Sequence, residues 1–129
     1  MSDLVDFLRA RIDKDEALAR ACAAAPWRAL PAGQIVVDSP DSDAAPAPAP
    51  VASAENLTYA EHIARHDPAR VLRDVETRRR LIAEYEKNAW RASQGRGEQY
   101  VDPWETTLRL LAEVYDHHPA YQEAWRPGS

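Results

Sequence analysis

The stretch DPARVLRDVETRRRLIAEYEKNAWRA, residues 67–92, decides the fold of this 129-residue chain. Its first two residues predict a helix start, because an N-cap aspartate accepts a backbone N–H bond and proline fits the first helical position. The apolar side chains that follow share one stripe at helical spacing: Val71, Val75, Ile82, Tyr85 and Ala89. We therefore expect a long amphipathic helix from Asp67 to about Ala92.

Charged residues cover the rest of this helix. Residues 65–96 hold nine basic and five acidic side chains, whereas the whole chain has a net charge of −5. The run Arg78–Arg80 forms no single basic face, because consecutive side chains diverge around a helix. Asp74 and Glu76 lie four residues before the first and last of these arginines, an order that favours pairing. We expect pairing within the protein, which disfavours a nucleic-acid partner.

Two further amphipathic segments flank this stretch. Residues 2–25 predict a first helix, with apolar positions at Leu4, Phe7, Leu8, Ile12, Leu18, Ala19 and Cys22. Beyond Gly95–Gly97, Asp102 is expected to be the N-cap of a third helix. The apolar face of that helix comprises Trp104, Leu108, Leu111, Tyr115 and His118. Tyr121 and Trp125 are expected to pin a short last turn back onto the domain.

The region between the first two helices is less regular. Residues 27–30 and 35–37, joined by Pro31-Ala32-Gly33, predict a β-hairpin. Residues 39–54 contain four Pro and six Ala with one sizeable apolar side chain, so we expect a flexible Ala/Pro-rich linker. Thr58 then predicts the cap of a short helix that ends near Arg65.

These elements predict a mainly α fold with a small β-hairpin. Three principal helices form a small antiparallel bundle with short flanking helical turns, in a single domain over residues 1–129 that contains the linker. Leu, Ile, Val and Phe make up only 23 of the 129 residues. Such a composition excludes a large enzyme core.

The composition also bears on the cellular compartment. No apolar run approaches the roughly 18 residues that cross a bilayer, and acids stand where a signal peptide has basic residues. Cys22 is the only cysteine, so no internal disulfide is expected. We therefore expect a cytoplasmic protein without membrane contact.

Four histidines are the candidates for a metal or ligand site. His62 and His66 are four residues apart and share a helix face, and His117 and His118 stand together before a proline. However, Ile63 follows His62 where the zincin motif has its catalytic glutamate. Imidazoles at helix ends also satisfy free carbonyl groups. We predict no metal, no cofactor and no catalytic residue, and no phosphate-binding loop or activated nucleophile is recognisable.

Several motifs resemble a family of small actinobacterial and actinophage proteins of unknown function. They are residues 4–11 (LVDFLRAR), 26–28 (PWR), 61–73 (EHIARHDPARVLR), 107–112 (TLRLLA), Tyr115, 118–119 (HP), Tyr121 and 123–127 (EAWRP). Some members of that family carry cysteines ahead of the last helix that suggest a metal knuckle, and residues 93–101 have none here. The resemblance implies an actinobacterial or phage source and no known activity.

The favoured function is that of a small acidic, non-catalytic binding or adaptor protein with an unknown protein partner, and a phage origin is left open. Its expected contact surface comprises aromatic side chains at the edge of the core and the corner formed by His66, Asp67 and Pro68. The candidate residues are His62, His66, Asp67, Arg70, Trp104, Tyr115, His118 and Trp125. Two alternatives stay open. One is a ligand- or metal-binding protein or minor enzyme built on His62, His66 and His118, and the other is a nucleic-acid-associated protein.

Overall fold

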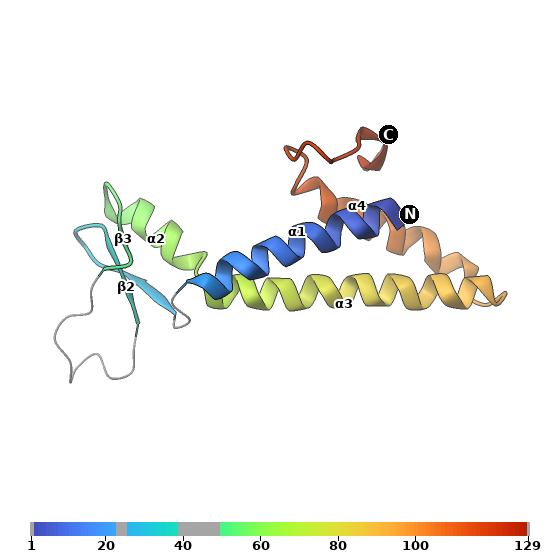
Figure 1. Cartoon of the computed structure of the whole chain (residues 1–129), viewed down its shortest axis with the longest axis horizontal. Coiled ribbons are helices and arrows are strands. Elements are labelled where there is room, and N and C mark those ends of the chain that lie inside the picture. The colour runs from blue at the N-terminus through green and yellow to red at the C-terminus, as the bar shows by residue number, and fades with distance from the viewer. Residues whose placement is uncertain (1, 23–25, 39–49, 129) are drawn as a thin grey trace. The chain divides into compact units, whose positions relative to one another are not determined.

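The computed structural model describes residues 2–22, 26–38 and 50–128 (Figure 1). The protein is mainly helical with a small antiparallel sheet, which confirms the predicted fold class. Its longer helices are α1 (Ser2–Ala21), α3 (Pro68–Ser93) and α4 (Val101–Glu113). The shorter elements are β1 (Trp27–Ala29), β2 (Gln34–Val37), β3 (Ala52–Ser53), α2 (Leu57–Arg65), η1 (Glu98–Tyr100) and η2 (Glu123–Trp125).

The chain forms two compact units. We call Met1–Lys14 with Val75–Ser129 the helical unit, and Asp15–Asp74 the sheet unit. Helices α1 and α3 each contribute residues to both. The single domain that the sequence predicts over residues 1–129 stays a prediction.

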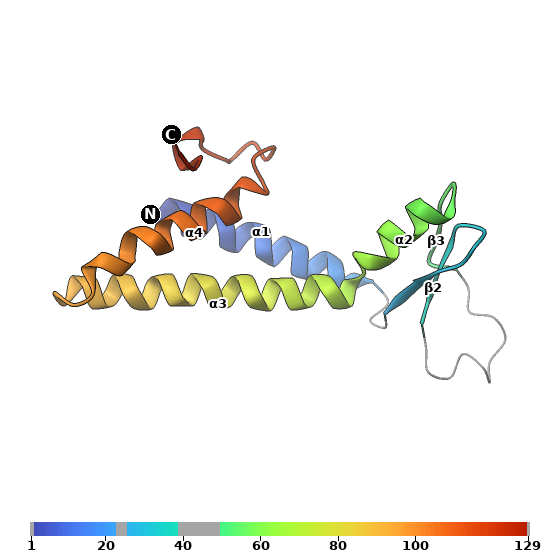
Figure 2. The same ribbon diagram turned by 180° about the vertical axis from the view of Figure 1, so that it is seen from behind.

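The helical unit is an antiparallel arrangement of helices, seen side by side from both directions (Figure 1, Figure 2). Arg9 of α1 pairs with Glu86 of α3, and Asp13 pairs with Arg79, so residue numbers rise along α1 as they fall along α3. Its core contains residues of each predicted apolar stripe, whereas Leu18 and Cys22, which were also predicted on the apolar face of the first helix, belong to the sheet unit and are exposed. The buried side chains include Leu4, Phe7, Leu8, Ile12, Val75, Ile82, Tyr85, Leu108, Ala112 and Trp125.

The start of α4 differs from the prediction. Asp102 was expected at the N-cap, but α4 begins at Val101, and Asp102 lies in its first turn. The reason is η1, which precedes α4 directly and brings Tyr100 into the helical conformation before Asp102 is reached. Asp102 still faces the positive end of the helix dipole, where a carboxylate is favourable.

The sheet unit confirms the predicted hairpin. β1 pairs antiparallel with β2, and Trp27, Arg28 and Ala29 lie opposite Val37, Val36 and Ile35 in that order. The turn that joins them ends at Gly33, whose φ is +94°. A Cβ at Gly33 would lie 2.4 Å from the carbonyl oxygen of Ala54, so both the backbone angle and the close packing require glycine there.

A third strand extends this sheet, in the order β1-β2-β3. Residues 39–54 were predicted as a flexible linker, and of these residues 39–49 lie outside the described part of the chain. Within the remainder, Val51 N–H donates to the Ile35 carbonyl and Ala54 N–H to the Gly33 carbonyl, 2.7 Å each. These backbone bonds hold β3 against β2, a pairing that the sequence did not predict.

Two helix caps position the surfaces considered below. Thr58 was predicted to cap α2, but the cap is Asn56, whose side chain accepts from the Tyr59 backbone N–H at 3.0 Å. Asp67 caps α3 as predicted, because its Oδ1 accepts from Arg70 N–H at 2.9 Å. Throughout the described residues, no helix is long and apolar enough to cross a membrane.

Candidate functional site

The sheet unit has an open cleft on the outer face of α2, which we call the α2 cleft. Its volume is about 620 Å³, and it is lined by Ala54, Glu55, Thr58, Tyr59, His62 and Ile63. The Tyr59 side chain is 55% exposed and Ile63 is 37% exposed, although both have large apolar surfaces. Ala60, which follows Tyr59 directly and therefore points to a different side of α2, is fully buried. The helix therefore packs inward through small alanine and leaves its bulkier side chains facing outward.

His62 and His66 lie together on this face, as their spacing predicts. Their ring centroids are 4.5 Å apart, and His66 Nδ1 is 2.7 Å from the His62 carbonyl oxygen. His66 is the C-cap residue of α2, and its side chain is satisfied by a carbonyl of the last turn. His62 lines the α2 cleft, and His66 lies next to it at the C-terminal end of the helix.

Asp67 and Arg70 form the corner that follows α2. Asp67 is only 8% exposed, and its second carboxylate oxygen accepts from the Trp27 backbone N–H at 3.0 Å. Arg70 is exposed, and its guanidinium donates to the Arg65 carbonyl. Asp67 thus ties the start of α3 to β1, whereas Arg70 offers a charge to solvent in the first turn of α3.

The remaining predicted site residues belong to the helical unit, where most of them surround Phe7. The Phe7 ring centroid lies 5.1 Å from that of Trp125, 5.7 Å from that of His118 and 6.3 Å from that of Tyr115. Trp125 is buried, while Tyr115 and His118 are partly buried. Trp104 is also partly buried, on α4. The aromatic cluster comprises Phe7, Tyr115, His118, Tyr121 and Trp125, and the contacts of these rings are mostly internal.

His118 occupies an unusual position in this cluster. Arg11 Nη1 lies 2.6 Å from His118 Nε2, and the Ala120 backbone N–H points at Nδ1 from 3.0 Å. Both neighbours are obligate donors, so a ring protonated on both nitrogens accepts from neither of them. Desolvation, and then the charges of Arg11 and His117, lower the pKa of His118 below its ordinary value. The structure thus favours the neutral imidazole.

We expect this arrangement to make stability depend on pH. The folded state binds the His118 proton less readily than the unfolded chain does. The contribution of His118 to the stability of the folded protein is therefore full above about pH 6.5 and is lost as pH falls below it. In an NMR titration, the His118 ring signals should move with a pKa below 6.5. His118→Gln should flatten the rise of Tm between pH 5.5 and 7.5. A titration at or above the ordinary value, or an equally steep Tm curve in the variant, would contradict this assignment.

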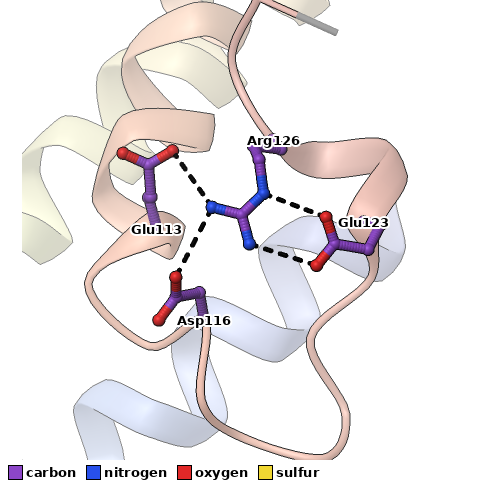
Figure 3. A network of polar contacts seen from close by, with 4 residues as sticks. All are labelled: Glu113, Asp116, Glu123 and Arg126. Atoms are coloured by element: carbon purple, nitrogen blue, oxygen red, sulfur yellow. Dashed lines mark hydrogen bonds and ion pairs between the residues drawn. The ribbon is translucent and has the colours of Figure 1, made fainter.

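A charged network fixes the C-terminal turn to the end of α4 (Figure 3). Arg126 binds Glu123 through two contacts, Nε to Oε2 at 2.9 Å and Nη2 to Oε1 at 3.1 Å. Its Nη1 also lies 3.4 Å from an Asp116 oxygen and 3.7 Å from one of Glu113. Hydrogen bonding to Arg126, together with its charge, lowers the pKa of Glu123. The predicted pinning of the last turn is confirmed by the ring contacts of Tyr121 and Trp125 with Phe7, and the Arg126 network adds to it.

The three consecutive arginines of α3, Arg78–Arg80, make contacts with other side chains of the same chain. Arg78 donates to the Tyr115 hydroxyl at 2.5 Å, Arg79 pairs with Asp13 at 2.8 Å, and Arg80 pairs with Glu76 at 2.6 Å. The Glu76–Arg80 pair follows the expectation from sequence, and the Arg79–Asp13 pair joins α3 to α1. Surface pairs of this kind add little stability, but they reduce the charge available to phosphate groups.

His62, His66 and His118 were the candidate ligands of a metal ion. His62 and His66 belong to the sheet unit, and His118 belongs to the helical unit. Among the described residues, no group of three or more His, Cys, Asp or Glu side chains has a metal-binding arrangement. Of these histidines, His62 lines the α2 cleft.

Several exposed apolar residues were missed by the sequence reasoning. Tyr59 and Ile63 were not selected, and Trp90, Tyr100, Leu110 and Val114 of the helical unit are also more than half exposed. By contrast, Trp125 was expected at the rim and is only 8% exposed. One signal was present for α2: Ala60 and Ala64 form a stripe of small residues, which marks the inward face of a closely packed helix.

The comparison with protein families adds one finding. The model of a family of unknown function, DUF6221, matches residues 1–127. The chain belongs to DUF6221. This DUF6221 protein has no match among curated proteins and none among solved structures. Since the family has no known function, a proposal about the function of this protein depends on the geometry of its surface.

Proposed function

We propose that this protein is a non-catalytic binding protein that acts through protein–protein contacts, with the α2 cleft as its contact surface. The observation that carries the proposal is the exposure of Tyr59 and Ile63 around a cleft of about 620 Å³. A tyrosine buries a large rigid surface at a low entropy cost and keeps a hydroxyl for hydrogen bonding. Such residues supply much of the binding energy at protein interfaces.

The residues selected from the sequence take different places in this proposal. His62 lines the cleft, and His66 lies beside it. Arg70 adds an exposed charge in the first turn of α3, and the buried Asp67 caps that helix. Trp104, Tyr115 and His118 are only partly exposed and supply a secondary surface on the helical unit. Trp125 acts as an anchor of the fold.

The biological setting is also part of the proposal. The resemblance of the sequence motifs supports a source in actinobacteria or their phages, and the abundance of Ala, Arg and Pro agrees with a high-GC genome. The lone Cys22 is consistent with a reducing compartment such as the cytoplasm. In that setting the protein acts as an adaptor on a host complex.

A comparison of two tyrosines tests the contact surface. Tyr59 and Tyr100 are both 55% exposed, but only Tyr59 lines the cleft. We expect Tyr59→Ser to weaken binding of a protein captured from host lysate at least tenfold, whereas Tyr100→Ser should leave it unchanged. Titration calorimetry or biolayer interferometry with the purified partner measures both. Equal binding by the two variants would remove the α2 cleft from the proposal.

The alternative functions predict other outcomes. A metal-binding protein should bind Zn²⁺ in a calorimetric titration and lose that binding in His62→Ala and His66→Ala. A nucleic-acid-binding protein should retain labelled DNA or RNA with an affinity that falls steeply as salt is raised. Either result, without a protein partner, would overturn the proposed function.

A further inference from the structure

We propose that His118 forms an acid-sensitive latch: when its ring takes up a second proton, residues 116–128 leave α1, while α1, α3 and α4 stay folded together. We call residues 116–128 the C-terminal segment, and the state with this segment on α1 the closed state. The inference goes beyond the proposed function, because it concerns the helical unit, whereas the α2 cleft belongs to the sheet unit. It is carried by the contacts that join the segment to α1.

His118 is the polar link between the C-terminal segment and α1. Arg11 Nη1 of α1 lies 2.6 Å from Nε2 of the ring, and the Ala120 backbone N–H points at Nδ1 from 3.0 Å. A neutral ring has one nitrogen that accepts a hydrogen bond, and a doubly protonated ring has none. The second proton therefore removes the acceptor and places two positive charges side by side.

The surroundings of the ring do not compensate a second proton. The charged groups that act on His118 are Arg11 from α1 and His117 from the segment itself, and both oppose a positive ring. Within the described part of the chain, no carboxylate bonds to the ring. The carboxylates at this end of the unit contact Arg126 instead: Glu113, Asp116 and Glu123. The phenols of Tyr115 and Tyr121 stay neutral in the acidic range.

Ring contacts complete the attachment of the segment to α1. The Phe7 ring centroid lies 5.7 Å from that of His118, 6.1 Å from that of Tyr121 and 5.1 Å from that of Trp125. Phe7 and Arg11 are four residues apart on α1, so the two side chains that hold the segment are neighbours on one helix face. A change at His118 therefore acts directly on the place where the segment and α1 meet.

Other contacts of the helical unit do not involve His118. Ion pairs join α1 to α3 at two points. Tyr115, which precedes the C-terminal segment, accepts from Arg78 of α3 at 2.5 Å. Arg126 joins the segment to Glu113 at the end of α4 (Figure 3). All these contacts can persist when the segment leaves α1, so the change is expected to be local.

The direction of the pH effect follows from the two states of the latch. Desolvation, and then the charges of Arg11 and His117, lower the pKa of His118 in the closed state, and release of the segment restores it towards the ordinary value. The latch is therefore closed above about pH 6.5. As pH falls below that value, the ratio of closed to released protein drops by up to about tenfold for each pH unit.

The test uses the exposure of Phe7, which is the only phenylalanine of the chain and is 6% exposed. Isotope-labelled phenylalanine gives one set of ring signals in an NMR titration of the full chain with a neutral gadolinium relaxation agent. As pH is lowered from 7.5 to 5, paramagnetic broadening of the Phe7 ring should rise severalfold, with the midpoint of the His118 titration. Its nuclear Overhauser contacts with Trp125 should weaken in parallel, while the helical circular dichroism signal is retained.

Three variants show whether His118 causes the release. His118→Gln should remove the pH dependence of Phe7 exposure, because glutamine does not titrate. His117→Gln, at the exposed neighbouring histidine, is the matched control and should keep it. Arg11→Gln removes the opposed charge, so His118 should titrate closer to its ordinary value, with a smaller change in Phe7 exposure.

Two results would overturn the latch at His118. One is a Phe7 ring that stays shielded while His118 titrates, and the other is an equal rise of its exposure in His118→Gln. A helical circular dichroism signal that is lost together with the shielding of Phe7 also overturns the inference, because the whole unit then unfolds and no local release takes place.

Discussion

Replacing Phe7 by alanine is expected to lower the free energy of unfolding of the helical unit by about 3–5 kcal/mol, the range observed for buried aromatic residues. Phe7 is only 6% exposed, and its ring contacts each of the other aromatic side chains of the cluster. Its ring has edge or tilted contacts with Tyr115, His118, Tyr121 and Trp125, and the Arg11 guanidinium carbon lies 5.9 Å from its centroid.

The loss should exceed that of an isolated core residue because two parts of the chain meet at Phe7. α1 supplies the ring, while the segment after α4 supplies the residues around it. Without the ring, Trp125 loses the surface on which it packs, and the Arg126 network alone holds the last turn. That network is on the surface, where ion pairs contribute little.

Urea denaturation followed by circular dichroism measures this effect. Phe7→Leu keeps much of the buried volume and should lose less than Phe7→Ala. Lys14→Gln, at an exposed position of the same helix, should change the free energy of unfolding by less than about 0.5 kcal/mol. A loss of under about 1 kcal/mol in Phe7→Ala would show that the cluster does not organise the unit.

The helices of this protein were predictable from sequence because their signals are local. A stripe such as Leu4, Leu8 and Ile12 specifies the buried face of a helix wherever the partner lies. Asp67-Pro68 specifies the start of α3 in the same way. The hairpin was also predictable, since the turn residues and β-branched positions lie within eleven residues of one another in the sequence.

Other elements depend on contacts that no local pattern encodes. β3 has two residues, and it exists because backbone groups at Val51 and Ala54 meet β2. Its Ala/Pro-rich surroundings have no alternating pattern to announce it. α4 begins before Asp102 because η1 runs directly into it, so the cap rule was overridden by the preceding turn.

In the candidate site, too, some features follow from local sequence and others depend on contacts between distant residues. The helical spacing of His62 and His66 predicted that they lie together. Tyr59 and Ile63, also four apart, have the spacing of a buried stripe, and the small side chains of Ala60 and Ala64 were the sequence signal that a different side of α2 packs inward. The environment of His118 was beyond prediction, because Arg11 is 107 residues away in the sequence.

Replacing Asp67 by alanine is the second large effect, with an expected loss of about 2–4 kcal/mol. One carboxylate oxygen caps α3 through Arg70 N–H, and the other accepts from Trp27 N–H. Loss of an aspartate cap costs about 0.5–2 kcal/mol. A buried donor left without its acceptor costs about 1–3 kcal/mol more.

Two variants separate these contributions. Asp67→Asn keeps one side-chain oxygen, which caps α3, but its amide nitrogen cannot accept from Trp27, so it should lose less than Asp67→Ala. Glu61→Ala, at an exposed position of α2, is the control and should change stability by less than about 0.5 kcal/mol. Hydrogen exchange gives an independent measurement, since the Trp27 amide should exchange faster in both Asp67 variants. If that amide keeps its protection in Asp67→Ala, the carboxylate does not join β1 to α3, and the loss of stability must then come from the cap alone.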